Sequence, residues 1–296
     1  MEADAAMTAA CMHNFALSDG RQLAWAEYGD GGGAPVIYMH GTPSSHLEPW
    51  AFRVDEAAQR AGLRLIAPDR PGMGGSDFQR RRRILDWPAD LAALADHLDL
   101  KQFSVLGYSG GVPFATAVAF ALPERVQRLT LVACVAHLAP ALEEGLHRNG
   151  LQLKRLARAR PRLARVVMSL GMGLPSLYPS LLLKMVGAGL PEVDRAVLDD
   201  QRIREGFPGA IRCAFRRGAS GPQVDEALMS AEWGFDPAEI RVTTMLWQGT
   251  LDTFGARPAM AEHLHRAILG SELHLSHDGH LSVLTKHLDE ILDGLT

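Results

Sequence analysis

One stretch of the sequence decides the fold: Phe103-Ser104-Val105-Leu106-Gly107-Tyr108-Ser109-Gly110-Gly111. It has the pattern of a short apolar strand that runs into a serine flanked by glycines, and a helical run from Val112 to Leu122 follows. Glycines let the backbone turn sharply without a Cβ clash. A G-x-S-x-G sequence between a strand and a helix predicts a nucleophile elbow, which exposes the serine in strained backbone. The free N–H groups of the new helix can then hold negative charge beside the serine oxygen.

The bulk composition is that of an ordinary globular protein. The chain has 296 residues, which is enough to bury a sizeable core, with 47% hydrophobic and 22% charged residues. A net charge of −4 gives no reason to expect nucleic acid or a membrane surface as a bulk partner. The three cysteines are odd in number and unclustered, which argues against a disulfide framework or a CxxC metal site and favours a reducing cytoplasm. The first twenty residues lack the apolar core of a signal peptide, and no run has the character of a membrane span.

Before the elbow, strand and helix patterns alternate. Apolar runs with turn residues at their ends predict strands at 13–17, 21–28, 35–40 and 63–67, the first two joined as a hairpin. Helices are predicted at 49–61 and from Pro88 to Leu98, with Asp86 as the N-cap of the second. Short connections between such elements imply a mostly parallel sheet covered by helices on both faces, an α/β fold.

After a further strand at 126–135 the alternation stops. Residues 137–236 show only helical patterns, and strands return at 243–248 and 272–276, each followed by a helix, at 257–268 and 280–292. We therefore expect one α/β core made of residues 13–136 and 237–296. Residues 137–236 are expected to form an inserted helical cap, placed as a lid, and residues 1–12 a flexible start.

A serine needs a base, and the base needs an orienting carboxylate. In this architecture both partners should follow later strands, in the order Ser, acid, His. Asp252 follows the strand ending at Trp247, and His280 follows the strand ending near Ser276. His277 is a rival base that we consider weaker, because His280 follows a glycine and opens the last helix.

The loop after the strand at 35–40 reads His40-Gly41-Thr42-Pro43. Its position makes the Thr42 and Gly110 backbone amides the candidate oxyanion donors. His40 lies too early in the chain order to be the base, so we interpret it as a residue that fixes this loop.

Three further features carry a plainer interpretation. The glycine-rich loop at 71–76 lacks the spacing of a phosphate-binding motif, so it is expected to be a structural turn. The run Arg80–Arg83 is expected to be a solvated loop. Residues 145–190 contain eight Lys or Arg and no Asp or Glu, with Leu153, Leu156, Leu163, Val167 and Leu170 near helical spacing. We interpret them as a core-facing stripe with a wet basic face; the alternative is a lid that favours anionic or amphiphilic acyl substrates.

These motifs together resemble the α/β-hydrolase fold superfamily from about residue 15 to the end of the chain. The resemblance rests on the loop at 40–43, Asp69-Arg70-Pro71-Gly72-Met73-Gly74-Gly75-Ser76, the elbow, Gly249-Thr250-Leu251-Asp252 and Gly279-His280. It extends to bacterial esterases and proline iminopeptidases. It implies Ser109 as nucleophile, His280 as base, Asp252 as orienter, and Thr42 and Gly110 as oxyanion amides. The sequence Pro43-Ser44-Ser45-His46 departs from the Pro-Gly that the family often has there.

The sequence thus predicts a cofactor-free and metal-free serine hydrolase that cleaves a small or medium carboxylic ester through an acyl-enzyme. An aminopeptidase of the proline iminopeptidase type, a thioester or carbon–carbon bond hydrolase, and a small-molecule receptor on the same fold remain open. The acid-free stretch at 145–190 counts against the aminopeptidase alternative, although the insertion still offers Glu192, Asp194, Asp199, Asp200 and Glu205. The expected partner is a small molecule rather than nucleic acid or a bilayer interior, and the chain could be a monomer or a homodimer.

Overall fold

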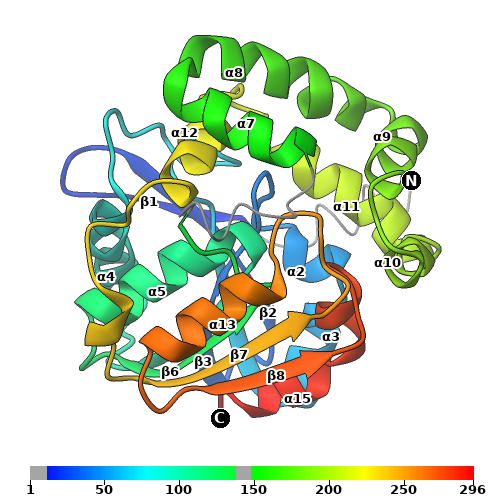
Figure 1. Cartoon of the computed structure of the whole chain (residues 1–296). Helices are drawn as coiled ribbons and strands as arrows, with labels where there is room; N and C mark the ends of the chain where they lie inside the picture. The colour runs from blue at the N-terminus through cyan, green and yellow to red at the C-terminus, as the bar shows by residue number, and fades with distance from the viewer. Residues whose placement is uncertain (1–11, 138–147) are drawn as a thin grey trace.

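The structure, a computed structural model, describes residues 12–137 and 148–296 (Figure 1). The described residues build one eight-stranded sheet in the order β1-β2-β4-β3-β5-β6-β7-β8. Strands β1 and β2 pair antiparallel, as do β2 and β4, and every other pair is parallel. The strands are β1 His13–Ala16, β2 Gln22–Gly29, β3 Ala34–Met39, β4 Leu63–Pro68, β5 Phe103–Tyr108, β6 Val126–Val132, β7 Thr243–Gly249 and β8 Glu272–Ser276.

Helices cover both faces of this sheet, as the alternation predicted (Figure 1). On one face lie α4 Trp87–His97, α5 Val112–Ala121 and α13 Pro258–Ala267; on the other lie α3 Val54–Arg60 and α15 Leu288–Asp293. The central strand β5 is buried along its whole length because helices exclude water from both of its sides. The parallel strands end at one edge of the sheet, so the loops after β3, β5, β7 and β8 meet there.

Two predicted helices are broken in the structure. The helix expected at 49–61 is α2 Glu48–Ala51 followed by α3, because Arg53 takes a left-handed φ of 60° between them. The closing helix is α14 Ser282–Lys286 followed by α15, so His280 lies in the loop before it rather than on it. Asp86 precedes α4 as predicted, but its carboxylate accepts from the Arg83 amide (2.7 Å) rather than from the helix.

The described part of the chain between β6 and β7 is entirely helical apart from its connections. We call α7–α12 the helical insertion; they lie over the sheet edge at which the parallel strands end (Figure 1). The helices are α7 Arg148–Ala159, α8 Pro161–Met168, α9 Pro179–Gly187, α10 Glu192–Val197, α11 Gln201–Ala214 and α12 Ser220–Met229, with the short turns η3 Ser169–Gly173 and η4 Pro175–Leu177 between α8 and α9. Of residues 1–12, expected to be a flexible start, residues 1–11 lie outside the described residues. In the described ranges no helix is both long and apolar enough to cross a bilayer.

The glycine-rich loop at 71–76 is a structural turn, as predicted. It wraps around the buried Asp69, whose carboxylate accepts from the Gly75 amide at 2.9 Å. Gly74 has a φ of 51°, and a Cβ there would lie 1.9 Å from an Asp69 oxygen, so only glycine fits. The loop is shaped by a protein carboxylate, which would repel a phosphate.

Candidate active site

Ser109 lies in the sharp turn between β5 and α5. Its φ is 51°, the left-handed value that the elbow motif predicts for a non-glycine residue. A Cβ on Gly107 would lie 2.6 Å from the Ala115 Cβ, and one on Gly111 would lie 2.1 Å from the Met39 carbonyl oxygen. The flanking glycines therefore let β5, β3 and α5 approach closely enough to form the turn. Ser109 itself is half-buried.

A chain of hydrogen bonds joins the three residues that the sequence placed after separate strands. The Ser109 Oγ lies 2.9 Å from His280 Nε2, and His280 Nδ1 lies 2.6 Å from Asp252 Oδ2. An ionised carboxylate only accepts, so Nδ1 carries a proton toward Asp252 and Nε2 is left to accept from the serine hydroxyl. The second Asp252 oxygen accepts from the Phe254 amide at 3.0 Å, which fixes the carboxylate. His277, the rival base, is exposed.

The surroundings of His280 favour its charged form. Burial alone would favour the neutral ring, but the charge of Asp252 and its hydrogen bond outweigh burial and raise the pKa of His280, with smaller contributions from Asp194 and Glu48. A raised pKa suits a base that must hold a proton taken from serine.

The Asp252 and His280 loops are held together by their backbones. The Thr250 amide donates to the Ser276 carbonyl (2.8 Å), and the Leu251 amide donates to the Asp278 carbonyl (2.9 Å). A Cβ on Gly249 would lie 2.4 Å from the carbonyl oxygens of Asp278 and Gly279. This close approach requires glycine and brings the carboxylate within reach of the imidazole.

The His280 loop is also held by an acid from the helical insertion. Asp194 on α10 is fully buried, and its Oδ2 accepts from the His280 amide at 2.6 Å. Its Oδ1 accepts from the Leu281 amide (3.1 Å) and from the amide and hydroxyl of Ser282 (2.8 and 2.7 Å). A Cβ on Gly279 would lie 2.3 Å from this carboxylate, so the glycine admits it. The sequence marked Asp194 only as an available acid, because nothing local indicates a partner 86 residues away.

The loop that carries Thr42 lies against the elbow. Both candidate oxyanion residues, Thr42 and Gly110, line the same cavity as Ser109, and a Cβ on Gly110 would lie 2.6 Å from Thr42 Oγ1. The Gly41 amide donates to the buried carboxylate of Glu48 at 2.7 Å. The His40 ring is buried 2.8 Å from the Gly41 carbonyl, as expected of a residue that fixes this loop. Burial and the neighbouring Arg70 charge lower the pKa of His40 to about 3, so it stays neutral.

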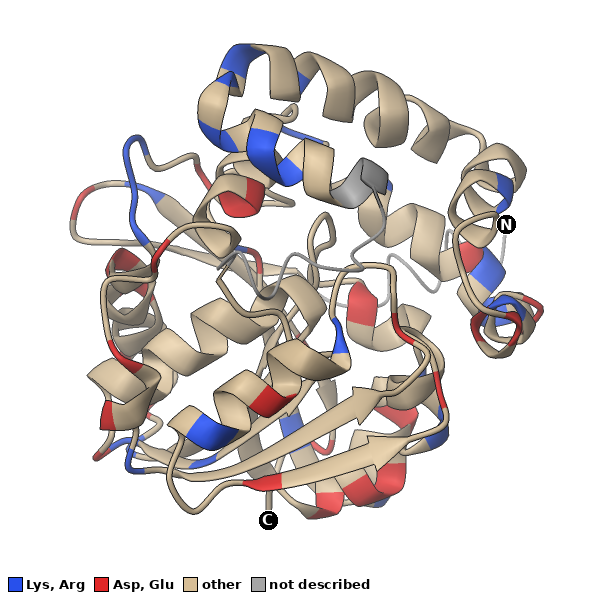
Figure 2. Ribbon diagram, in the orientation of Figure 1, with Lys and Arg blue, Asp and Glu red and all other residues tan. Residues whose placement is uncertain are grey.

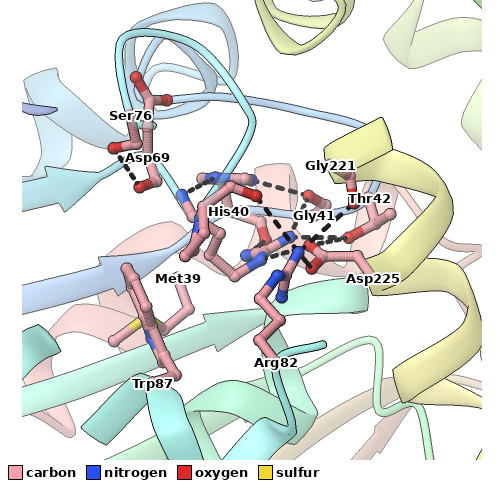
Figure 3. A network of polar contacts seen from close by, with 12 residues as sticks. Met39, His40, Gly41, Thr42, Asp69, Ser76, Arg82, Trp87, Gly221 and Asp225 are labelled. Carbon is pink, nitrogen blue, oxygen red and sulfur yellow. Dashed lines mark hydrogen bonds and ion pairs between the residues drawn. The ribbon is translucent and has the colours of Figure 1, made fainter. Parts of the chain in front are cut away.

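A buried charge cluster joins the Thr42 loop to the helical insertion (Figure 3). The Arg70 guanidinium donates to the carbonyls of His40 (2.5 Å) and Gly41 (2.9 Å) and to Thr42 Oγ1 (2.7 Å), and its Nε donates to Asp225 on α12 at 2.6 Å. Arg82 donates to the other Asp225 oxygen at 2.5 Å.

The prediction of a solvated arginine run is therefore wrong for Arg82. Its side chain is 2% exposed because it neutralises an acid from the helical insertion, while Arg80, Arg81 and Arg83 are exposed. Burial would raise the pKa of Asp225, but the charges of Arg82 and Arg70 outweigh burial and lower it.

A cavity of about 450 Å³ opens above Ser109, between the sheet edge and the helical insertion. Most of its wall is apolar, and four methionines from the insertion contribute to it: Met168, Met172, Met185 and Met229. Among the described residues that line it, the charged ones are Lys154 on α7 and Glu226 on α12, which pair at 2.9 Å and are both nearly buried. The cavity thus suits an apolar, uncharged group next to the serine hydroxyl.

Comparison with known proteins identifies the family of this chain. The sequence pattern described as alpha/beta hydrolase fold matches residues 34–287, which is most of the chain. The chain belongs to the α/β-hydrolase fold family. The fold class predicted from the five motifs is confirmed.

Individual members of the family differ in how much of this chain they resemble. An uncharacterized hydrolase, YcgS, from Bacillus subtilis is 26% identical over 92% of this chain and 93% of its own length. The acetyltransferase component of an acetoin cleaving system from Pseudomonas putida is 38% identical, but over 38% of this chain and 30% of its own length. For the relatives with the strongest partial matches, this acetyltransferase component among them, the chain spans less than half of their own length. A solved esterase from Thermogutta terrifontis superposes with a TM-score of 0.69 at 22% identity, covering 95% of each chain. Membership of the family is therefore established, but members of this family catalyse several kinds of reaction.

Proposed function

We propose that this α/β-hydrolase is a serine hydrolase that cleaves a neutral carboxylic ester of small or medium size through an acyl-enzyme. The observation that carries the proposal is the continuous chain of hydrogen bonds from Asp252 through His280 to Ser109, at the floor of an apolar cavity. Such a chain is what converts a weakly nucleophilic hydroxyl into one that can attack a carbonyl carbon.

In the first half of the reaction, Ser109 Oγ attacks the ester carbonyl carbon while His280 Nε2 takes the hydroxyl proton. Asp252 keeps the ring oriented and stabilises the imidazolium that forms. The carbonyl oxygen becomes an oxyanion that the Thr42 and Gly110 amides hold. Collapse of this intermediate breaks the C–O bond, and His280 returns the proton to the departing alcohol.

In the second half, water attacks the acyl carbon and gives its proton to His280. The carboxylic acid leaves as the Ser109 Oγ recovers that proton. No external oxidant, reductant or cofactor is required for either half.

The walls of the cavity favour an ester over a substrate that carries an ammonium group. An aminopeptidase needs a free carboxylate to bind that group, and the insertion was the predicted source of one. Among the described residues, Asp194 is occupied by four donors from the His280 loop and Glu226 is paired with Lys154. Asp225 is held between Arg70 and Arg82. None of the acids that the sequence offered for this role is among the described residues that line the cavity, and Glu226, which does line it, is paired. The aminopeptidase is therefore the weaker candidate.

A fluorophosphonate probe tests the proposal directly, because it labels an activated serine irrespective of the physiological substrate. We expect the parent chain to be labelled and to hydrolyse p-nitrophenyl esters, with the best acyl length set by the cavity. Ser109→Ala should lose labelling and about 10⁴-fold or more of the turnover. Ser180→Ala, at an exposed position on α9, is the matched control and should retain both.

Two results would contradict the proposal. Labelling of the Ser109→Ala chain at parental efficiency would move the nucleophile elsewhere. A folded parent that neither reacts with the probe nor turns over any ester of the series would favour the receptor alternative.

A further inference from the structure

The outer face of the helical insertion exposes an unusual number of large apolar side chains. Of the thirteen exposed large hydrophobic residues in the described part of the chain, nine lie between residues 163 and 185. We call these nine the outer apolar face: Leu163, Val166, Val167, Leu170, Leu174, Leu177, Tyr178, Leu181 and Met185. Single exposed hydrophobic residues are common, but nine of them gathered between residues 163 and 185 point to a surface that binds something.

The geometry of α8 shows why the described part of the chain does not cover this face. The helix buries Ala164 and Met168, one turn apart, toward the rest of the insertion. Leu163, Val166 and Leu170 form a stripe on the opposite side and are 52%, 53% and 62% exposed. The predicted core-facing stripe is therefore wrong for this helix, because Leu163, Val167 and Leu170 point outward. A helix that is apolar on both sides needs a second apolar environment to cover its outer side.

The charges around the outer apolar face indicate what this second apolar environment is. Residues 148–190 hold eight Lys or Arg and no Asp or Glu, and Figure 2 shows blue without red along α7, α8 and α9. Lys154 and Arg165 bond to side chains of α12, and Arg158 donates to the carbonyl of Ser230 just after it. The exposed Arg162 precedes Val166 by one turn, and the exposed Lys184 lies between Leu181 and Met185. The apolar stripe is thus bordered by cations.

We propose that the outer apolar face is a docking surface for an anionic lipid bilayer. Its exposed leucines and valines would enter the boundary between headgroups and acyl chains, while the bordering cations meet lipid phosphates. A second copy of the chain fits less well. A two-fold contact through this face would bring Arg162 and Lys184 of both copies into one interface, and residues 148–190 supply no acid to neutralise them.

The outer apolar face meets the cavity above Ser109 at Met185. This residue belongs to the face and also lines the cavity, next to Met168 and Met172, which line the cavity but are not part of the face. A substrate dissolved in the bilayer could then reach the serine without crossing water. This delivery rests on the proposed function, whereas docking itself does not.

Sedimentation with lipid vesicles tests docking separately from catalysis. The full-length Ser109→Ala chain is mixed with vesicles of phosphatidylcholine alone or of phosphatidylcholine with phosphatidylglycerol. We expect binding to the mixed vesicles, weakened by salt, and little binding to phosphatidylcholine alone. The substitutions Arg162→Gln and Lys184→Gln should each weaken vesicle binding by about fivefold.

Matched variants separate the outer apolar face from general hydrophobicity. Leu163→Gln, Val166→Gln and Leu170→Gln together should abolish vesicle binding. The control combines Phe78→Gln, Leu269→Gln and Leu275→Gln, which are exposed elsewhere at 39%, 77% and 49%, and it should bind like the parent. Each triple variant is also made in a chain that keeps Ser109. Its hydrolysis of a short soluble ester then shows that the fold is retained.

Three outcomes would overturn the proposal: no sedimentation with anionic vesicles, equal loss in both triple variants, or a triple variant of the face that binds like the parent. Light scattering tests a fourth outcome that would overturn the proposal. A dimer of the parent that the face substitutions convert to a monomer would assign the face to a second copy.

Discussion

Replacing Asp194 by asparagine should damage the candidate active site without touching a reacting atom. In the parent, Oδ1 accepts three bonds and Oδ2 accepts one, from the His280 amide at 2.6 Å. The asparagine oxygen can replace Oδ1, but its NH₂ group then faces the His280 N–H, donor against donor. Losing a bond to a charged group costs about 1.5–3 kcal/mol, and a buried unpaired donor adds about 1–3 kcal/mol. We expect a destabilisation of about 3–5 kcal/mol, which lowers Tm by roughly 10 °C.

The same change should alter the pH profile. The negative charge of Asp194 helps to raise the pKa of His280, so its removal lowers that pKa. The free enzyme needs a neutral His280 to accept the serine proton, and the acid limb of kcat/KM should therefore move to lower pH. Looser placement of the ring should reduce kcat itself by about 10–100-fold.

The assay combines a thermal melt with kcat/KM for a p-nitrophenyl ester across the pH range. Glu192→Gln is the matched control, because Glu192 lies in the first turn of the same α10 helix and is exposed. That variant should keep the parent's Tm and profile. An Asp194→Asn chain with the parent's Tm, or with an acid limb displaced to higher pH, would refute the reasoning.

Two other predictions concern the base and the buried charge cluster. His280→Ala should reduce ester turnover as severely as loss of the nucleophile, while His277→Ala, at an exposed position, should retain most of it; the reverse ranking in steady-state kinetics would move the base to His277. Asp225→Asn leaves Arg70 and Arg82 buried without their anion, so denaturant titration should show a loss of about 3–5 kcal/mol. The pKa of Asp225 is lower in the folded chain than in the unfolded chain. The stabilisation from its charge is therefore complete above the ordinary aspartate pKa and is lost as the pH falls through the folded-state pKa. The stability gap between parent and variant should therefore narrow in acid, and a gap that widens there would contradict the assignment.

Much of the core and of the site could be predicted because both depend on local patterns in a fixed order. The elbow glycines, the acid after β7 and the histidine after β8 each sit at the end of an apolar run, and parallel strands bring such ends to one edge. The elbow could therefore be placed beside the Asp252 and His280 loops, which lie more than a hundred residues further along the chain, without knowing any contact between them.

The contacts of the helical insertion could not be predicted in this way. Asp194 and Asp225 find partners 86 and 155 residues away, and no spacing encodes that distance. The periodicity of Leu163, Val167 and Leu170 correctly indicated a shared helix face. It could not indicate whether the face turns inward or outward, because this depends on how α8 packs against α7 and α12.

The ties made by Asp194 and Asp225 bear on how readily this chain could be re-engineered. Exchanging the helical insertion for that of a relative is an obvious way to change the substrate. In this chain the exchange would also remove the carboxylate beneath the histidine loop and the counter-ion of the arginine that holds the Thr42 loop. A transplanted insertion would therefore need acids at both places before its new cavity could be of use. The segment that lines the cavity is, in this molecule, also part of the scaffold of the candidate active site.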